Sequence, residues 1–438
     1  MADPLGNDRA RRFGRRTWLL ATSASAASAA MGRTPLGGSL NFTLPWAVYS
    51  LDPHDLYDPC AALFGSAITD PLYALDAHGR PYPALADGMP SAAARGASVR
   101  LRPGIVTAQG RRLSISDVHW SLTRARSRAA RGLLSEFGAP RLAADSVHYA
   151  TADPTRLAIA LASPCCAILP RSFRPEQPDG TGALAATARG GGLNLQRNPR
   201  AARGAAFLDQ LSLRPAQSLS DALRAFESET TDLGWLGDGL HRRRPGAQPF
   251  TSAAVGWVVL RTGAAAGAWS AAGVAQRLLE GMAPGALSRF GLTPASAGGS
   301  TRWGGGDAEI AVDDRQPFLA EVADALAGAL SQPGHQLRVA RLQPAEIARR
   351  RSADTFTLMI DLVRNLSLGP NRDGLALVTA ANPALADRPP KVSGASAAQL
   401  ARTLPLGIIG ELKPSGYFVG PWRGFPAWDF GALHLAEP

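Results

Sequence analysis

The sequence is short of cysteine and of charged residues. It has three cysteines in 438 residues, Cys60, Cys165 and Cys166, and this number is too small for a disulfide-held scaffold. Only 18% of the residues are charged, whereas 45% are hydrophobic. A mostly disordered chain has the opposite composition, with low hydrophobicity and high net charge, so that class of protein is excluded. The length predicts two or three folded domains.

Lysine is nearly absent, although the chain carries a net charge of +11. Only Lys391 and Lys413 are lysines, and the other basic residues are arginines. Combined with abundant alanine, this indicates a bias of nucleotide composition. The basic runs at 241–244 and 349–351 are short and far apart, and no aromatic residues alternate with them. A surface that binds nucleic acid needs a larger basic patch, so we expect solvated faces and no nucleic-acid partner.

Common catalytic motifs are missing as well. The sequence has no Gly-x-x-x-x-Gly-Lys loop, no His-Glu-x-x-His and no Gly-x-Ser-x-Gly. Phosphate binding, metal-dependent hydrolysis and acyl transfer by these particular motifs are therefore excluded. Its seven histidines are scattered without the spacing of metal ligands. Asp52, Asp55 and Asp58 surround His54. A catalytic or metal site is one interpretation of this group, and an ordinary capped loop is the favoured one. We expect no enzyme activity, no metal and no cofactor.

The first 29 residues have the pattern of an export signal. Arg15-Arg16-Thr17-Trp18 follows other arginines, and a weakly apolar run of about 14 residues comes next. This run is too short to cross a bilayer, which needs ~20 residues. Small residues at 27–29 offer a cleavage site. The pattern resembles a twin-arginine signal and predicts a periplasmic protein; a disordered basic arm is the alternative.

Export leaves two states open for the cysteines. In an oxidising compartment Cys60 can pair with Cys165 or Cys166. Three buried free thiols are the other possibility.

Alternating and helical patterns are mixed throughout the rest of the chain, which predicts an α/β protein with more than one lobe. The helical patterns lie at 117–131, from 220 onward and at 318–330. The predicted strands are 38–45, 98–102, 157–161, 207–214, 255–260, 309–312, 336–339 and 356–363.

Eight short segments follow one another in a recognisable order. They are 38–45 with 51–54, 70–73, 79 with 83–86, 99–105 with 110, 113–122, 180–182, 197–199 with 209, and 225–227 with 231–233. Leu51-Asp52-Pro53-His54 and Gly180-Thr181-Gly182 are two of the clearest. In this order the segments resemble the dipeptide, oligopeptide and nickel family of extracellular solute-binding proteins of ABC transporters (family 5).

The resemblance implies a two-lobed periplasmic binding protein clamp (type II-like) with an extra α/β domain inserted in lobe one. Lobe one is expected at 34–50, 179–263 and 396–438, the extra domain at 51–178, and lobe two at 264–395. It also implies that a hinge closes the lobes on a peptide or other small solute, with no chemical step, and that a membrane permease receives the solute. The protein is expected to be a monomer.

The sequence departs from the family pattern in and near lobe two. That lobe is short, and the acidic residue that meets a peptide's amino terminus in the family falls near Arg364 or Asn365. An arginine there favours an anion. These departures motivate the alternative that the chain is a divergent member without transport, acting as a sensor or accessory interaction protein.

Six side chains are the candidates for the ligand pocket, because aromatic rings give broad contact and arginines orient a charged ligand. Each is also open to interpretation as a core or surface residue. The candidates are Trp46, Tyr49, Trp235, Trp257, Arg261 and Arg364.

Overall fold

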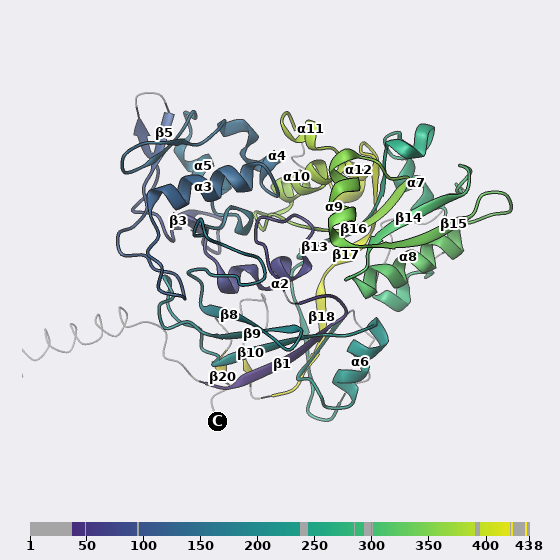
Figure 1. The fold of residues 1–438 in the computed structure, drawn as a ribbon, viewed down its shortest axis with the longest axis horizontal. Helices are drawn as coiled ribbons and strands as arrows, with labels where there is room; N and C mark the ends of the chain where they lie inside the picture. The colour runs from purple at the N-terminus through teal and green to yellow at the C-terminus, as the bar shows by residue number, and fades with distance from the viewer. Residues whose placement is uncertain are drawn as a thin grey trace, which may run out of the picture. The chain divides into compact units, whose positions relative to one another are not determined.

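The computed structural model (Figure 1) describes residues 37–48, 50–93, 96–236, 244–283, 285–292, 299, 301–389, 395–420, 422–423 and 434–435. The described residues belong to one compact unit. The predicted export signal lies outside the described residues. Within them, no helix has the length and apolarity needed to cross a membrane.

A seven-stranded sheet begins at the start of the described chain. Leu40, Phe42 and Leu44 alternate along β1 (Ser39–Leu44) and are fully buried, which explains why this segment forms a strand. β1 pairs in parallel with β10 (Gln210–Pro215) and β11 (Leu233–Leu236), and the other pairs in the sheet are antiparallel. The strand order is β12 (Gln248–Thr251), β18 (Pro414–Phe418), β11 (Leu233–Leu236), β1 (Ser39–Leu44), β10 (Gln210–Pro215), β9 (Gly192–Arg197) and β8 (Leu184–Arg189).

A second sheet has five strands, in the order β15 (Leu337–Leu342), β14 (Ala308–Asp313), β16 (Leu358–Arg364), β13 (Gly256–Thr262) and β17 (Leu406–Leu412). Every residue of β13 and β16 is buried. Val258 packs in one hydrophobic cluster with residues of α7 (Val274–Glu280) and α8 (Pro317–Leu330). Val259 packs in another, with residues of α10 (Pro370–Ala381) and α12 (Ala397–Ala401). Helices therefore cover both faces, which explains the continuous apolar runs.

The strand–helix–strand unit predicted around 309–339 is present. β14 and β15 pair in parallel, and α8 connects them and contacts both strands. α9 (Pro344–Ala353) then leads into β16, which pairs in parallel with β14.

The chain crosses between the two large sheets at two short segments. One crossing is 252–255, between β12 and β13, and the other is at residue 413, between β17 and β18. The predicted lobe-one segments 179–263 and 396–438 each contain one strand, β13 or β17, that pairs in the five-stranded sheet. The predicted boundaries at 263 and 396 therefore differ from the observed crossings by one strand in each case.

Residues 51–178 carry small sheets and several helices. α2 (Pro59–Ile68) packs in the same cluster as β1, whereas β2 (Tyr73–Leu75), β5 (Gly96–Val99), β7 (Val147–Tyr149) and the helices α3 (Ile115–Arg126), α4 (Arg131–Leu134) and α5 (Pro154–Ala160) contribute residues to a second cluster. β2 pairs with β3 (Pro81–Pro83), and β4 (Ser91–Ala93), β5, β7 and β6 (Arg141–Leu142) form a four-stranded sheet.

The strand predicted at 157–161 is wrong. The segment is the helix α5, because Asp153 accepts a hydrogen bond from the backbone of Arg156 and Pro154 occupies the first turn. Leu157, Ala158 and Ala160 are buried. A short apolar run fits a buried helix and a buried strand equally well, so its pattern alone could not decide.

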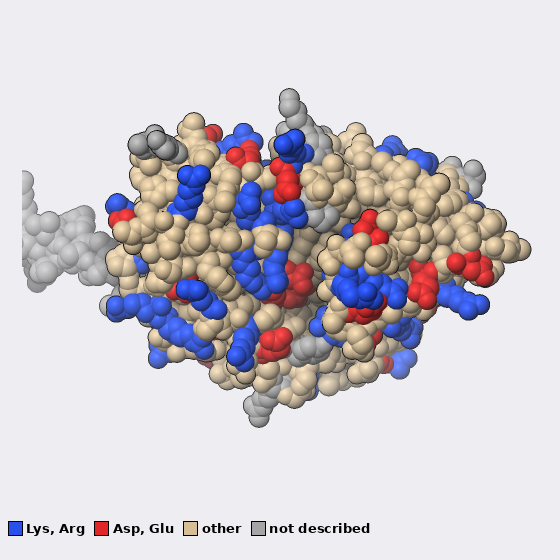
Figure 2. Space-filling view, turned by 45° about the horizontal axis from the view of Figure 1, so that its top comes forward, with Lys and Arg blue, Asp and Glu red and all other residues tan. Residues whose placement is uncertain are grey.

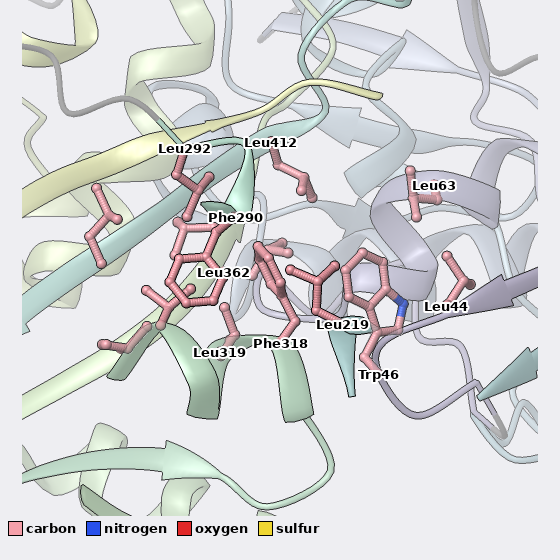
Figure 3. Packing of buried hydrophobic residues seen from close by; sticks show 14 of the residues in the cluster. Leu44, Trp46, Leu63, Leu219, Phe290, Leu292, Phe318, Leu319, Leu362 and Leu412 are labelled. Carbon is pink, nitrogen blue, oxygen red and sulfur yellow. The ribbon is translucent and has the colours of Figure 1, made fainter. Parts of the chain in front are cut away.

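One large hydrophobic cluster connects the two large sheets (Figure 3). The Trp46 and Phe318 rings pack edge to face with their centroids 6.3 Å apart, and the centroids of Phe318 and Phe290 are 6.2 Å apart. Two backbone hydrogen bonds accompany these rings: Ala47 N donates to Arg315 O at 2.9 Å, and Phe318 N donates to Pro45 O at 3.1 Å. The loop after β1 is therefore fixed against the start of α8.

Candidate ligand-binding cleft

A cavity of about 310 Å³ lies where the loop after β1 faces α9 and β16. Its volume is at the lower end of the range for small-molecule sites. Carboxylates outnumber arginines among its lining residues, and we call it the acidic cleft. Its charged lining residues are Asp52, Asp55, Asp58, Glu176, Asp313, Asp361, Arg315 and Arg351.

Asp52 is neutralised within the protein. Arg124 donates to both of its oxygens, at 2.8 and 2.6 Å, and Arg128 donates to Oδ2 at 3.1 Å. Burial pushes the pKa of Asp52 up, but the hydrogen bonds and charge of Arg124 outweigh burial and leave it below its usual value. Asp52 Oδ1 also accepts from the backbone N–H of His54. The favoured interpretation of this segment as a capped loop agrees with these contacts.

His54 is buried and neutral at neutral pH. Its Nε2 lies 2.8 Å from the carbonyl oxygen of Ala167. Burial, followed by the charge of Arg124, lowers the pKa of His54 to about 4. The described residues contain no group of three or more His, Cys, Asp or Glu side chains arranged to hold a metal ion.

In the described structure no arginine forms a salt bridge with Asp55 or Asp58, although the charge of Arg351 opposes the effect of burial, which raises the pKa of Asp55. Asp58 caps α2, accepting from Ala61 N at 3.0 Å and from Asp52 N at 2.7 Å. Burial, together with the nearby charge of Asp55, raises the pKa of Asp58 to about 7. Burial also raises the pKa of Asp55. In the described part of the chain neither residue forms a salt bridge, and neither does Glu176.

Asp361 lies in the middle of β16 between two arginines. Arg261 Nη1 donates to Oδ2 at 3.0 Å, while Arg351 donates from Nε at 3.2 Å and from Nη2 at 2.6 Å. Burial pushes the pKa of Asp361 up, but Arg351 and Arg261 outweigh it and the pKa is lowered. The Arg351 guanidinium lies 3.8 Å from the centre of the Tyr57 ring. Asp361, Arg351 and Tyr57 form one wall of the cleft, and Arg261 supports Asp361 from behind it.

None of the six side chains predicted for the pocket is among the lining residues of the acidic cleft. Trp46 is in the core beside Phe318, and Tyr49 lies outside the described residues. Trp235 belongs to β11, but its side chain is outside the described part. Trp257 lines another cavity, of about 680 Å³, beside the crossing at 252–255.

The two predicted arginines are both buried. Arg261 is held by Asp361, as described above. Arg364 donates from Nη1 to the carbonyl oxygen of Pro53 at 3.0 Å. Three residues before it, Asp361 supplies a carboxylate to the cleft.

The sequence analysis overlooked Arg351 and Asp361 as site residues. Asp361 had a signal, because a single aspartate interrupts the apolar strand 358–363, and a buried charge needs a partner. The prediction that both basic runs are solvated is wrong for two residues. Arg351 lies mostly buried against Asp361, and Arg244 donates to the carbonyl oxygens of Phe226 and Thr231. Long arginine stems bury readily once acceptors are near.

All three cysteines are free and buried. Of the two states left open by the sequence, the structure has the free thiols. Burial raises the pKa of each thiol, most strongly for Cys60 and Cys166, so these cysteines are unreactive.

Comparison with solved structures identifies the fold. DppA from Helicobacter pylori, a periplasmic binding protein in complex with the peptide STSA, superposes with a TM-score of 0.68 at 13% identity, covering 92% of this chain and 99% of that one. The murein tripeptide binding protein MppA from Escherichia coli gives 0.68 at 14% identity, covering 91% and 99%. The chain has the fold of the periplasmic binding proteins.

A third similar structure shows that this fold accepts other ligands. AgaA from A. tumefaciens R10, in complex with agropinic acid, has a TM-score of 0.67 at 15% identity, covering 92% of this chain and 99% of that one. No family model and no curated protein matches the sequence. The expected two-lobed α/β clamp is confirmed, and the expected likeness to family 5 is confirmed as a likeness of fold.

Proposed function

We propose that this chain is the exported substrate-binding protein of an ABC transporter, which captures a peptide or another small solute and delivers it to a membrane permease. The acidic cleft is the observation that carries the proposal. It is bounded by the loop after β1 on one side and by α9 and β16 on the other. Two short crossings join the two sheets, at 252–255 and at residue 413, and such crossings allow hinge closure around a ligand.

The charge of the cleft selects the ligand. Asp55, Asp58 and Glu176 line it without salt-bridge partners in the described structure, whereas Asp52, Asp313 and Asp361 are paired with arginines. Burial raises the pKa values of Asp55 and Asp58, and a bound ammonium group would favour the charged form of both carboxylates and pair with them. The proposal therefore favours a cationic solute in this cleft over the anion predicted from Arg364.

Native mass spectrometry of the exported protein tests the function. A co-purifying small molecule with an amino group, released by denaturation, is the expected result. Adding that molecule back should raise the melting temperature, because a ligand that binds only the folded state stabilises it. A clean protein mass, with no thermal shift from peptide mixtures, favours the alternative of a non-transporting sensor or accessory protein.

Glu176→Gln is the variant that tests the cleft itself. Glu176 is exposed and lines the cleft, so the substitution should weaken binding of the amino ligand without unfolding the protein. Glu309→Gln is the matched control, because Glu309 is exposed, pairs with Arg350 and does not line the cleft. Equal affinities of the two variants would place the ligand elsewhere.

A further inference from the structure

A second cavity, of about 460 Å³, adjoins the acidic cleft and has the opposite charge. Both cavities are lined by Asp55, Tyr57 and Arg351. We call the second one the arginine pocket, after its lining residues Arg128, Arg131, Arg261 and Arg351. The function proposed above makes no use of this pocket.

Arg261 is the strongest indication that the pocket has a ligand. Its side chain is 3% exposed, and it forms one hydrogen bond, from Nη1 to Asp361, within the described structure. A guanidinium has five N–H donors. The Phe356 and Tyr57 rings lie near it, with centres 5.1 and 5.9 Å away, and offer no strong acceptor. The remaining donors of a buried cation are therefore left to whatever fills the pocket.

The arginines around the pocket outnumber the carboxylates that pair with them. Arg261 and Arg351 both bind Asp361, and Arg128 shares Asp52 with Arg124.

Arg131 alone has a carboxylate to itself, that of Asp387. Five guanidinium groups thus divide three carboxylates. Among the described residues Asp55 is the only acidic one that lines the pocket, and burial raises its pKa. His54, which also lines it, is neutral. An excess of positive charge is left at a pocket whose inner side, at Arg261 and Arg351, is buried and whose outer side, at Arg128 and Arg131, is partly exposed.

We propose that the arginine pocket binds the carboxylate group of a small organic anion. A carboxylate accepts two parallel N–H bonds from an arginine fork, which matches the donors that Arg261 leaves unused. Arg128 lies between α3 and α4, Arg131 is the first residue of α4, and Arg351 belongs to α9. The anion therefore bridges the inserted domain and the five-stranded lobe. Figure 2 shows basic side chains gathered on one face of the molecule, with acidic side chains next to them.

Calorimetry on the exported protein tests the site with acetate, succinate and citrate, with inorganic phosphate as a separate arm and sodium chloride at matched ionic strength. We expect saturable binding of at least one carboxylate. Arg128→Gln and Arg131→Gln should each weaken it about tenfold or more, since each removes a charge-assisted hydrogen bond. Both residues are partly exposed, so these variants should fold. Arg341→Gln, which removes an exposed arginine paired with Asp324 outside the pocket, is the control.

Each outcome decides a different question. Saturable phosphate binding without carboxylate binding would retain an oxyanion site and overturn its assignment to carboxylates. Equal responses to every salt, or full binding in both pocket variants, would overturn the site. Glu176→Gln separates this proposal from the proposed function, because that residue lines the acidic cleft alone. Loss of the amino ligand in Glu176→Gln, with carboxylate binding intact, would show two independent sites.

Discussion

At the scale of single residues, two buried aspartates each form salt bridges with two arginines. Asp52 is held by Arg124 and Arg128, and Asp361 by Arg261 and Arg351. Each aspartate is buried, so its charge is stable only because the guanidinium groups replace water as hydrogen-bond donors. The same arrangement leaves surplus donors facing the arginine pocket.

Replacing Asp361 with asparagine should therefore destabilise the fold strongly. The change leaves Arg261 and Arg351 without a counter-charge, and breaking a buried pair from one side costs about 3–5 kcal/mol in free energy of unfolding. Denaturant titration measures this loss. Asp324→Asn is the matched control, because its exposed pair with Arg341 should change stability by less than ~1 kcal/mol. Similar losses in both variants would contradict the role given to Asp361.

Asp58 should make stability depend on pH. Its pKa in the folded protein is about 7, raised from an ordinary value of 3.8. Between these values the folded state retains a proton that the unfolded state has released, so stability falls as pH rises from about 4 to 7.

Asp58→Asn should remove this dependence and still cap α2, because an asparagine oxygen also accepts from the helix backbone. The stability of the variant relative to the parent protein should increase by on the order of 2 kcal/mol between pH 5 and pH 8. Thermal unfolding at several pH values measures it, and a constant difference would contradict the raised pKa.

At the scale of elements, close approach of backbones positions the cleft. Gly182 lies against the end of α2, and a Cβ there would meet Ile68 C at 2.5 Å and Ala67 O at 2.6 Å. α2 carries at its other end the Asp58 cap that lines the cleft. The glycine therefore fixes the helix that holds one side of the site.

Gly182→Ala should cost about 1–3 kcal/mol in free energy of unfolding, because backbone atoms must move to admit the methyl group. Gly328→Ala provides the contrast. That residue lies within α8 with nothing near its Cβ position, so alanine should stabilise the helix by about 0.5–1 kcal/mol. Chemical denaturation of the two variants compares them, and a neutral Gly182→Ala would refute the close packing.

Several elements could be predicted from the sequence because their patterns were long. α8, with its apolar residues at helical spacing, and the alternating strand β1 are examples. α5 was mistaken for a strand because its apolar segment is short and its signals, Asp153 and Pro154, precede it. A hydrophobic pattern distinguishes a helix from a strand only where it is long enough to fit one period, about 3.6 residues or two, and not the other.

At the scale of the whole molecule, the proposed function requires the two lobes to open and close. Small-angle scattering should give a larger radius of gyration for the ligand-free protein than for the protein bound to its amino ligand. The physical reason is that, in the described part of the chain, the backbone passes between the two large sheets at 252–255 and at residue 413, so closure bends these two segments. Identical curves with and without ligand would contradict closure. Glu176→Gln with the same ligand concentration is the control.

Local periodicity was enough to predict the α/β class, and the order of short motifs was enough for the resemblance that implied a two-lobed binding fold. Which charges meet depends on how distant segments pack in three dimensions. Asp361, Arg261 and Arg351 are up to 100 residues apart in sequence and form one buried network. Their pairing depends on the antiparallel register of β13 with β16 and on where α9 packs, and neither can be read from the spacing of the residues. The pairing also separates the acidic cleft from the arginine pocket.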